Sequence, residues 1–488
     1  MEGTGKTFKR LVLAAGVAAI GAVSAPASAD METLLDKLHE KGVLSDEDYQ
    51  QMRTEARAER RSQALKDAKE EEKKQQPAPD STRFRMAEAM KSVELYGDIR
   101  LRYEDRIATS PSDVNYDRQR WRYALRIGVR GDLTSDFFYG LRLDTNTYGR
   151  SAWVTFADDN ANQGGKTSQA NKTNDVVSVG LVYLGWKPTN WLQIVGGRQP
   201  NPMFTTPMVW DPDISPEGLS EKLNFNLTDN FSLFGTGGQF IYQAFVSPST
   251  RDSDLSVGRQ NLMLYTFEAG ANYKLSELSA VRGAVNYYRY AGGQGTADYR
   301  STFTGTGTGY AGNIGVNDLE IIEVPIEFRF PVGSLSTAVY GNFAKNLQGS
   351  DRAARAGFSS YGGQDKAYQL GLSLGSQGIP QGAAAGATYG SSAKKGTWET
   401  RVYYQRIDQF ALDPNMIDSD FFERTNMEGW FAALAYSPAD AIITTLRYGN
   451  AKRANDNLGT GGFNDDSSGA NASIDKYKLL QLDVTLRF

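Results

Sequence analysis

Apolar and polar residues alternate along a series of extended segments between residue 93 and the C-terminus. In the segment 118–133, arginines occupy one parity and the other parity carries Trp121, Tyr123, Leu125, Ile127 and Val129. The last segment is apolar at every second position from Leu480 to Phe488. Because successive side chains of a strand point to opposite faces, this pattern predicts strands with one apolar and one polar face.

About sixteen such segments occur, and each is about ten residues long. An even number of strands of this length is typical of bacterial transmembrane barrels. They predict an all-β membrane protein, an antiparallel transmembrane β-barrel with lipid outside and a polar lumen inside. Pro325 falls on the polar parity of its segment and marks a candidate bulge. The predicted strands are 93–106, 118–133, 137–147, 175–187, 191–198, 218–227, 231–247, 261–274, 280–291, 318–330, 335–346, 365–376, 396–407, 428–437, 441–451 and 476–488.

The connections between these segments alternate between long and short, as expected when long loops face the exterior and short turns face the periplasm. For example, 148–174 is long, 188–190 is short and 199–217 is long again. The Gly- and Ala-rich segment 377–395 is long where a short turn is expected. It is either an insertion or a further hairpin, which would make eighteen strands.

The N-terminal region divides into three parts. An apolar stretch, Leu11–Ala25, follows basic residues and precedes Ala27-Ser28-Ala29, which predicts a secretory signal peptide. The next part has a helical pattern and predicts a short periplasmic arm, either a self-association element or a tether. The predicted domains are a signal peptide at 1–29, a helical arm at 30–68, a charged and Pro-containing linker at 69–92 and a barrel at 93–488.

The composition excludes several classes of protein. Mean hydropathy is −0.47, which argues against a bundle of helices that each need roughly 20 apolar residues to span a membrane. The chain has no Cys and one His, His39, which lies in the predicted arm. A cysteine nucleophile and a His-dependent triad in the barrel are therefore excluded. We predict no enzymatic activity, no cofactor and no metal.

Arginines on the polar parity of the predicted strands are the residues closest to function. Guanidinium groups remain charged in confined spaces, so they can tune which ions pass, or they can be structural partners of lumen acids. The third long loop, 199–217, either folds inward, with Phe204, Met208 and Trp210 as its packing anchors, or lies over the mouth. The candidate lining residues are Arg100, Arg102, Arg118, Arg120, Arg122, Arg126, Arg130, Arg142 and Arg198 on the wall, with Asp211, Asp213 and Glu217 on the loop.

The segment 93–488 resembles the putative porin family of Gram-negative outer membranes. The residues that carry this resemblance are Val93–Tyr103, Gly197–Gln199, Asp211–Gly218 and Gly238–Phe240. The resemblance implies a passive channel whose third long loop, 199–217, folds inward. The family often has a short helical arm before its barrel. The C-terminal Phe488 resembles the signal by which outer-membrane barrels are recognised for assembly.

The expected function is therefore passive diffusion of ions and small hydrophilic solutes through a water-filled channel in the outer membrane. The expected partners are outer-membrane lipids, the barrel-assembly machinery and two further copies in a homotrimer, with no nucleic acid. The alternative is a surface receptor or adhesin barrel that binds a partner through its long loops.

Overall fold

The computed structural model separates the chain into two units, Met1–Ala87 and Glu88–Phe488. The residues that it describes are 36–37, 40–41, 46, 49–50, 53–55, 90–111, 113, 115–133, 136–146, 151–156, 176–243, 261–291, 302–304, 310–313, 316–376, 394–422, 424–460 and 473–488.

The second unit is a closed antiparallel β-barrel of sixteen long strands with one short extra strand, β4 (Val154–Thr155). Consecutive long strands pair with one another, and β1 pairs with β19 to close the cylinder. The long strands are β1 (Glu94–Thr109), β2 (Asn115–Asp132), β3 (Phe137–Asn146), β5 (Val176–Thr189), β6 (Leu192–Arg198), β7 (Glu217–Asn226), β8 (Phe231–Gln243), β9 (Leu262–Lys274), β10 (Ala280–Ala291), β13 (Glu320–Val332), β14 (Leu335–Asn346), β15 (Lys366–Gly375), β16 (Trp398–Ile407), β17 (Met427–Ala439), β18 (Ile442–Arg453) and β19 (Lys476–Arg487).

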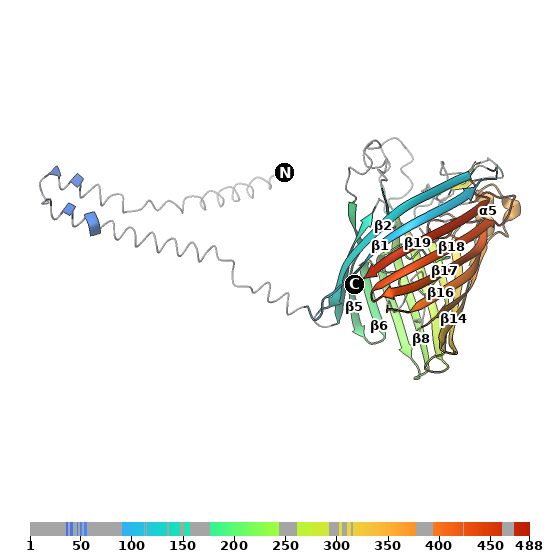
Figure 1. Ribbon diagram of the computed structural model, residues 1–488, viewed down its shortest axis with the longest axis horizontal. Helices are drawn as coiled ribbons and strands as arrows, with labels where there is room; N and C mark the ends of the chain where they lie inside the picture. The colour runs from blue at the N-terminus through green and yellow to red at the C-terminus, as the bar shows by residue number, and fades with distance from the viewer. Residues whose placement is uncertain are drawn as a thin grey trace, which may run out of the picture. The chain divides into compact units, whose positions relative to one another are not determined.

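The seam between the first and last strands is fully paired. Its register runs from Asp98 opposite Arg487 to Thr109 opposite Lys476, and the two strands lie side by side in Figure 1. Beyond it, the amide of Gly97 donates to the carbonyl of Phe488 at 2.8 Å, and the Phe488 amide donates back at 3.1 Å. A side chain at Gly97 would collide with the Phe488 ring, since an added Cβ would lie 2.7 Å from it. Closure leaves none of the sixteen long strands with an unpaired edge.

The prediction of sixteen strands is confirmed, and the alternative of eighteen is wrong. β15 pairs directly with β16 from Ala367 opposite Ile407 to Gly375 opposite Glu399, so no further hairpin stands between them in the wall. The candidate bulge at Pro325 is also wrong. Pro325 lies opposite Asn342 in an unbroken β13–β14 register.

The two faces of the wall differ as the alternation predicts. Large apolar side chains on the outward parity are exposed, for example Trp121 at 58 % and Leu370 at 63 %. Polar side chains on the inward parity are buried, and Glu323 and Gln481 are fully inaccessible. The barrel wall therefore has an apolar outer face, and its inner face carries buried polar side chains.

Long and short connections alternate at the two ends of the barrel. The short turns are two to five residues long, such as 333–334 and 275–279, and 376–397 is the exception. The first long connection, 110–114, is shorter than expected because both flanking strands extend beyond their predicted ends. Three long connections contain local structure: a small hairpin of β11 (Thr302–Thr304) and β12 (Tyr310–Asn313), helix α5 (Gly349–Arg355) with the turn η2 (Ser359–Tyr361), and β4.

The interior contains a packed apolar cluster, to which two connections contribute. Met208 and Trp210 come from the connection 199–216, and Ile417 and Phe421 come from the connection 408–426. They pack with inward-facing wall residues such as Tyr340. Both connections thus have an apolar side that is buried against the wall.

The first unit is described at a few helical positions only, where the Tyr49 hydroxyl donates a hydrogen bond to the Asp36 carboxylate. The predicted signal peptide at 1–29 and most of the arm at 30–68 and of the linker at 69–92 lie outside the described residues. No described helix has the length and apolar character needed to cross a membrane.

Candidate functional site

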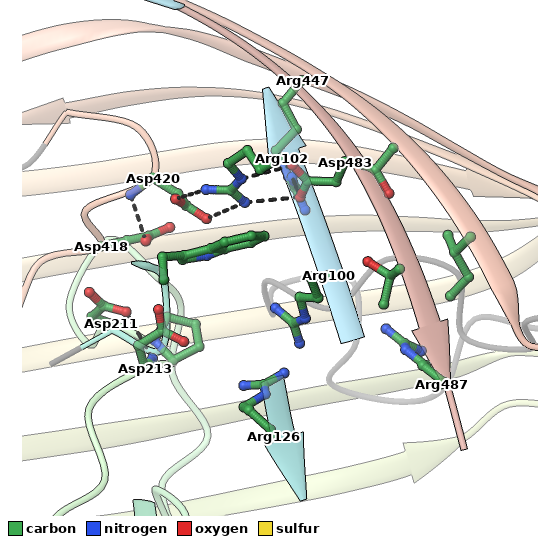
Figure 2. Close-up of a pocket in the computed structure, with 15 residues that line it drawn as sticks. Arg100, Arg102, Arg126, Asp211, Asp213, Asp418, Asp420, Arg447, Asp483 and Arg487 are labelled. Carbon is green, nitrogen blue, oxygen red and sulfur yellow. Dashed lines mark hydrogen bonds and ion pairs between the residues drawn. The ribbon is translucent and has the colours of Figure 1, made fainter. Parts of the chain in front are cut away.

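A charged cavity of about 180 Å³ lies between the barrel wall and the two inward connections. Five arginines and five aspartates line it, together with Trp153 and a few smaller side chains. Figure 2 shows Arg100, Arg126 and Arg487 on one side of the space, with Asp211 and Asp213 on the other. The arrangement places opposite charges across a narrow gap.

The basic side of the cavity comes from three neighbouring strands, β2, β1 and β19. Asp98 is a shared partner of two arginines: its carboxylate lies 2.7 Å from Arg100 Nε and 2.7 Å from Arg126 Nη2. Arg487 is opposite Asp98 in the β1–β19 register. Because Arg100 and Arg126 share one carboxylate, this patch of wall carries excess positive charge.

Arg102 connects the wall to the second inward connection. Its side chain is 1 % exposed and binds two carboxylates at once. Nε donates to Asp483 of β19 at 2.7 Å, and Nη1 donates to Asp420 of the connection 408–426 at 2.7 Å. Arg447 of β18 also donates to Asp483. Such a fully paired buried group fixes the position of Asp420 relative to the wall.

Trp153 lies under Arg102, with the guanidinium carbon 4.1 Å from the ring centroid. The short strand β4 explains this position. β3 pairs with β2 up to Asp144 opposite Arg126, and after an excursion the chain returns as β4, with Val154 opposite Tyr123. Part of the connection between β3 and β5 therefore pairs with the barrel wall as β4, and this places the Trp153 side chain at the cavity.

The connection 199–216 is held by a buried carboxylate, Glu323 of β13. Its oxygens accept hydrogen bonds from Thr205 Oγ1 at 2.6 Å, Tyr288 hydroxyl at 2.5 Å, and Asn286 Nδ2 at 2.9 Å. Asn342 Nδ2 adds a fourth at 2.6 Å. Every donor is neutral, so the carboxylate acts as a hydrogen-bond centre.

Further contacts bind the connection 199–216 to neighbouring strands. The Phe204 amide donates to Glu268 of β9 at 2.6 Å, and Phe204 packs against Phe234. Trp210 packs edge-on against Phe240, with ring centroids 6.3 Å apart. The three aromatic and sulfur side chains expected to hold this connection, Phe204, Met208 and Trp210, are all buried.

Backbone hydrogen bonds join the two connections to each other. The Asp211 amide donates to the Met416 carbonyl at 2.7 Å, and the Asp418 amide donates to the Pro207 carbonyl at 3.1 Å. The Ser419 amide also donates to Asp211 Oδ2 at 3.4 Å. The acidic side of the cavity is thus one assembly made from two distant parts of the chain.

The acids of this assembly differ in their electrostatic environment. Burial, followed by the neighbouring charges of Asp211 and Asp420, raises the pKa of Asp418 well above its ordinary value. Burial also acts to raise the pKa of Asp420, but Arg102 outweighs this and lowers it below its ordinary value. Asp420 therefore stays ionised to a lower pH than an ordinary aspartate, whereas Asp418 keeps its proton to a higher pH.

The structure brings together five of the twelve candidate lining residues, namely Arg100, Arg102, Arg126, Asp211 and Asp213. The others lie outside this cavity. Arg120 and Arg122 surround Glu104, Arg130 pairs with Glu94, Arg142 pairs with Asp144, and Arg118 lies opposite Arg106 near the long-loop end of β2. Glu217 is the first residue of β7 and pairs with Arg198 of the adjacent strand, not with the cavity wall.

Sequence reasoning missed several residues of the cavity. Arg447, Asp483 and Arg487 stand on the polar parity of the last two strands, so the alternation itself marks them as facing inward. Asp418, Asp420 and Trp153 lie in long connections, where no periodicity is available. Within the described ranges, no group of three or more histidine or carboxylate side chains is placed to hold a metal ion.

The chain has similarities to a known family and to solved structures. Residues 107–313 match a family model described as Putative porin. Similar solved structures include OprB of Pseudomonas putida, at 10 % identity over 84 % of this chain and 96 % of that one, with a TM-score of 0.47. A triple mutant of the porin of Rhodopseudomonas blastica matches at 10 % identity over 81 % of this chain and all of the other, with a TM-score of 0.37.

None of the curated proteins matches the sequence of this chain. The family model covers the strands from the end of β1 to the hairpin that follows β10. It includes the connection 199–216 and Arg126 of the cavity wall. The resemblance to the putative porin family is confirmed over residues 107–313.

Proposed function

We propose that this protein is an outer-membrane porin, a passive channel for ions and small hydrophilic solutes. The observation that carries the proposal is the pairing of an apolar outer surface with a charged cavity inside a closed barrel. An outward apolar face is stable in lipid, where acyl chains replace water around side chains such as Trp121 and Leu370. The signal-peptide pattern at 1–29 supports export to that membrane.

In this proposal the connections 199–216 and 408–426 form the constriction. Both have buried apolar sides against the wall, and both present carboxylates to the cavity. The arginines opposite them create an electric field across the path of a solute. Charges in such a confined, partly desolvated passage act more strongly on ions than charges at a wide mouth do.

The candidate residues outside the cavity have a different role in this scheme. Five of the arginines among them lie within 4 Å of an acid, as with Arg142 and Asp144 at 2.7 Å, which favours a structural role in holding the wall. Asp211 and Asp213, with Arg100, Arg102 and Arg126, are proposed to set ion preference. Phe488 is proposed as the contact for the barrel-assembly machinery, and the arm at 30–68 as an element of a homotrimer.

Planar-bilayer recording tests the channel and its selectivity together. The mature chain is expected to give ohmic conductance, and a chain that inserts without conducting would refute the proposal. Arg126→Gln should shift the reversal potential towards cation preference. One unit charge about 6 Å from an ion contributes about 0.7 kcal/mol in water, roughly a threefold change in permeability before screening by salt.

Arg130→Gln is the matched control, because Arg130 is on the same face of the same strand but is about half exposed and outside the cavity. It removes the same charge and should change the reversal potential much less. Equal shifts in the two variants would mean that the cavity is not the selective part of the path.

A further inference from the structure

We propose that the charged cavity is a binding site for a small dipolar solute that carries one carboxylate and one ammonium group, as a free amino acid does. The carboxylate would bind Arg100, Arg126 and Arg487, and the ammonium group would bind Asp213. This inference rests on the proposed function and adds the chemical class of solute that the constriction selects.

The basic wall has donors to spare for a carboxylate. Each guanidinium group has five N–H donors in a planar fork, which can bind a carboxylate through two parallel hydrogen bonds. Asp98 accepts from Arg100 and from Arg126, and it is opposite Arg487 in the register. One carboxylate cannot neutralise the two guanidinium groups of Arg100 and Arg126, so an anionic group that enters the cavity meets a net positive surface.

The opposite side offers an acceptor for a cation. Among the described residues, none makes a hydrogen bond or ion pair with the Asp213 carboxylate, although its backbone amide is bound by Asp211 Oδ1 at 2.8 Å. The turn that carries it is fixed, because Ile214 donates its amide to the Asp211 carbonyl at 3.0 Å. Trp210 Nε1 donates to the Ile214 carbonyl at 3.1 Å. Asp213 is therefore held in place facing the cavity, as Figure 2 shows.

A dipolar solute satisfies both sides at once, and a simple ion does not. A monocarboxylate bound to Arg126 would leave Asp213 unpaired and would be repelled by it. An ammonium ion at Asp213 would meet the excess positive charge of the wall. The cavity of about 180 Å³ is also smaller than the roughly 300–1,000 Å³ of sites for drug-sized ligands, so the solute has few heavy atoms.

The test compares glycine and β-alanine with acetate and methylammonium as blockers of single-channel current at pH 7 and constant ionic strength. We expect the two amino acids to reduce the current in a saturable way. Their half-blocking concentrations should be about tenfold lower than those of the single-charge ions, since a hydrogen bond to a charged group contributes about that factor. Equal block by acetate or methylammonium, or no saturable block, would overturn the inference.

Asp213→Asn should raise the half-blocking concentration of glycine about tenfold and remove its advantage over acetate. Glu217→Gln is the matched control. Glu217 directly follows the same connection, but its carboxylate pairs with Arg198 outside the cavity. This variant should leave block by glycine unchanged. If Asp213→Asn does not change the block, the site is not the one proposed.

Calorimetric titration of glycine into the detergent-solubilised chain separates this inference from the proposed function. Ohmic conductance in KCl without binding or block by glycine would overturn the inference and leave the porin intact. Binding that Asp213→Asn removes, in a chain that does not conduct, would overturn the porin and support the site.

Discussion

Individual charges in the lumen are stabilised in two different ways. Arg102 is buried between Asp420 and Asp483, so opposite charges compensate the loss of water. Glu323 is also buried, but its hydrogen bonds come from neutral groups on the wall and on the connection 199–216. Removing one partner from the Arg102 group leaves an unpaired charge. Changing Glu323 instead disturbs the connection 199–216, which its hydrogen bonds hold.

Asp418 should make ion preference depend on pH. Burial and the neighbouring Asp211 and Asp420 charges raise its pKa, so it is neutral at low pH and becomes negative only above the ordinary range for aspartate. As the pH rises through this value, the permeability of cations relative to anions should increase. Reversal potentials measured across a pH series will show the step.

The variant Asp418→Asn should lack that step while retaining conductance. A step of the same size in this variant would assign the titration to another group.

Glu323→Gln should loosen the connection 199–216. An amide has one oxygen in place of two, so its NH2 group would face donors from Asn286, Asn342 or Tyr288. Each buried donor left without an acceptor costs about 1–3 kcal/mol. Hydrogen exchange should therefore accelerate at the amides of 203–210.

Glu327→Gln provides a comparison, because Glu327 is another buried acid of β13 and lies 3.7 Å from Arg329 of the same strand. Hydrogen exchange at the amides of 203–210 in this variant should match that of the unchanged protein. Faster exchange in both variants would indicate a general weakening of the barrel.

At the scale of elements, the two inward connections determine the width of the proposed channel. The connection 408–426 is tied to the wall by Arg102 and to the connection 199–216 by backbone hydrogen bonds. Replacing 411–422 by a short Gly-Ser linker should increase single-channel conductance, because it removes the apolar and acidic side chains that fill part of the lumen. Single-channel recording in KCl measures the change directly.

A comparable replacement within 349–361, which contains α5 and η2 at the same end of the barrel, should leave the conductance close to its original value. These residues do not line the cavity. Unchanged conductance after the replacement of 411–422 would place that connection outside the path of the ions.

The strands could be predicted closely from sequence, since the alternation in a segment such as 476–488 depends only on neighbouring residues. The same alternation marked Arg100 and Arg126 as inward-facing. It could not reveal that Asp420 meets Arg102, because 318 residues separate them and the contact depends on how the barrel closes. Nor could it separate Arg126 from Arg130, which share one face and differ only in height along the strand.

At the scale of the whole molecule, stability depends on closure between β1 and β19. The paired amides and carbonyls of Gly97 and Phe488 complete this seam. Deleting Phe488 removes both hydrogen bonds and the proposed recognition signal, so a smaller fraction of the chain should reach the folded, membrane-inserted state. The mobility of unheated samples on SDS gels, compared with heated ones, measures that fraction.

Phe488→Tyr keeps the backbone and an aromatic ring and should assemble normally. Normal assembly after deletion would show that neither the terminal ring nor its backbone is needed for closure.

Main-chain hydrogen bonds join the two connections, from Asp211 to Met416 and from Asp418 to Pro207. They separate two properties of the passage. These main-chain hydrogen bonds help to fix the aperture, and exchanging a charged side chain such as that of Asp213 leaves them in place. In the proposed channel, carboxylates and guanidinium groups on the rim of this aperture set the preference among ions. The size limit for permeants and the preference among permeants of one size are therefore traits that substitutions can alter independently.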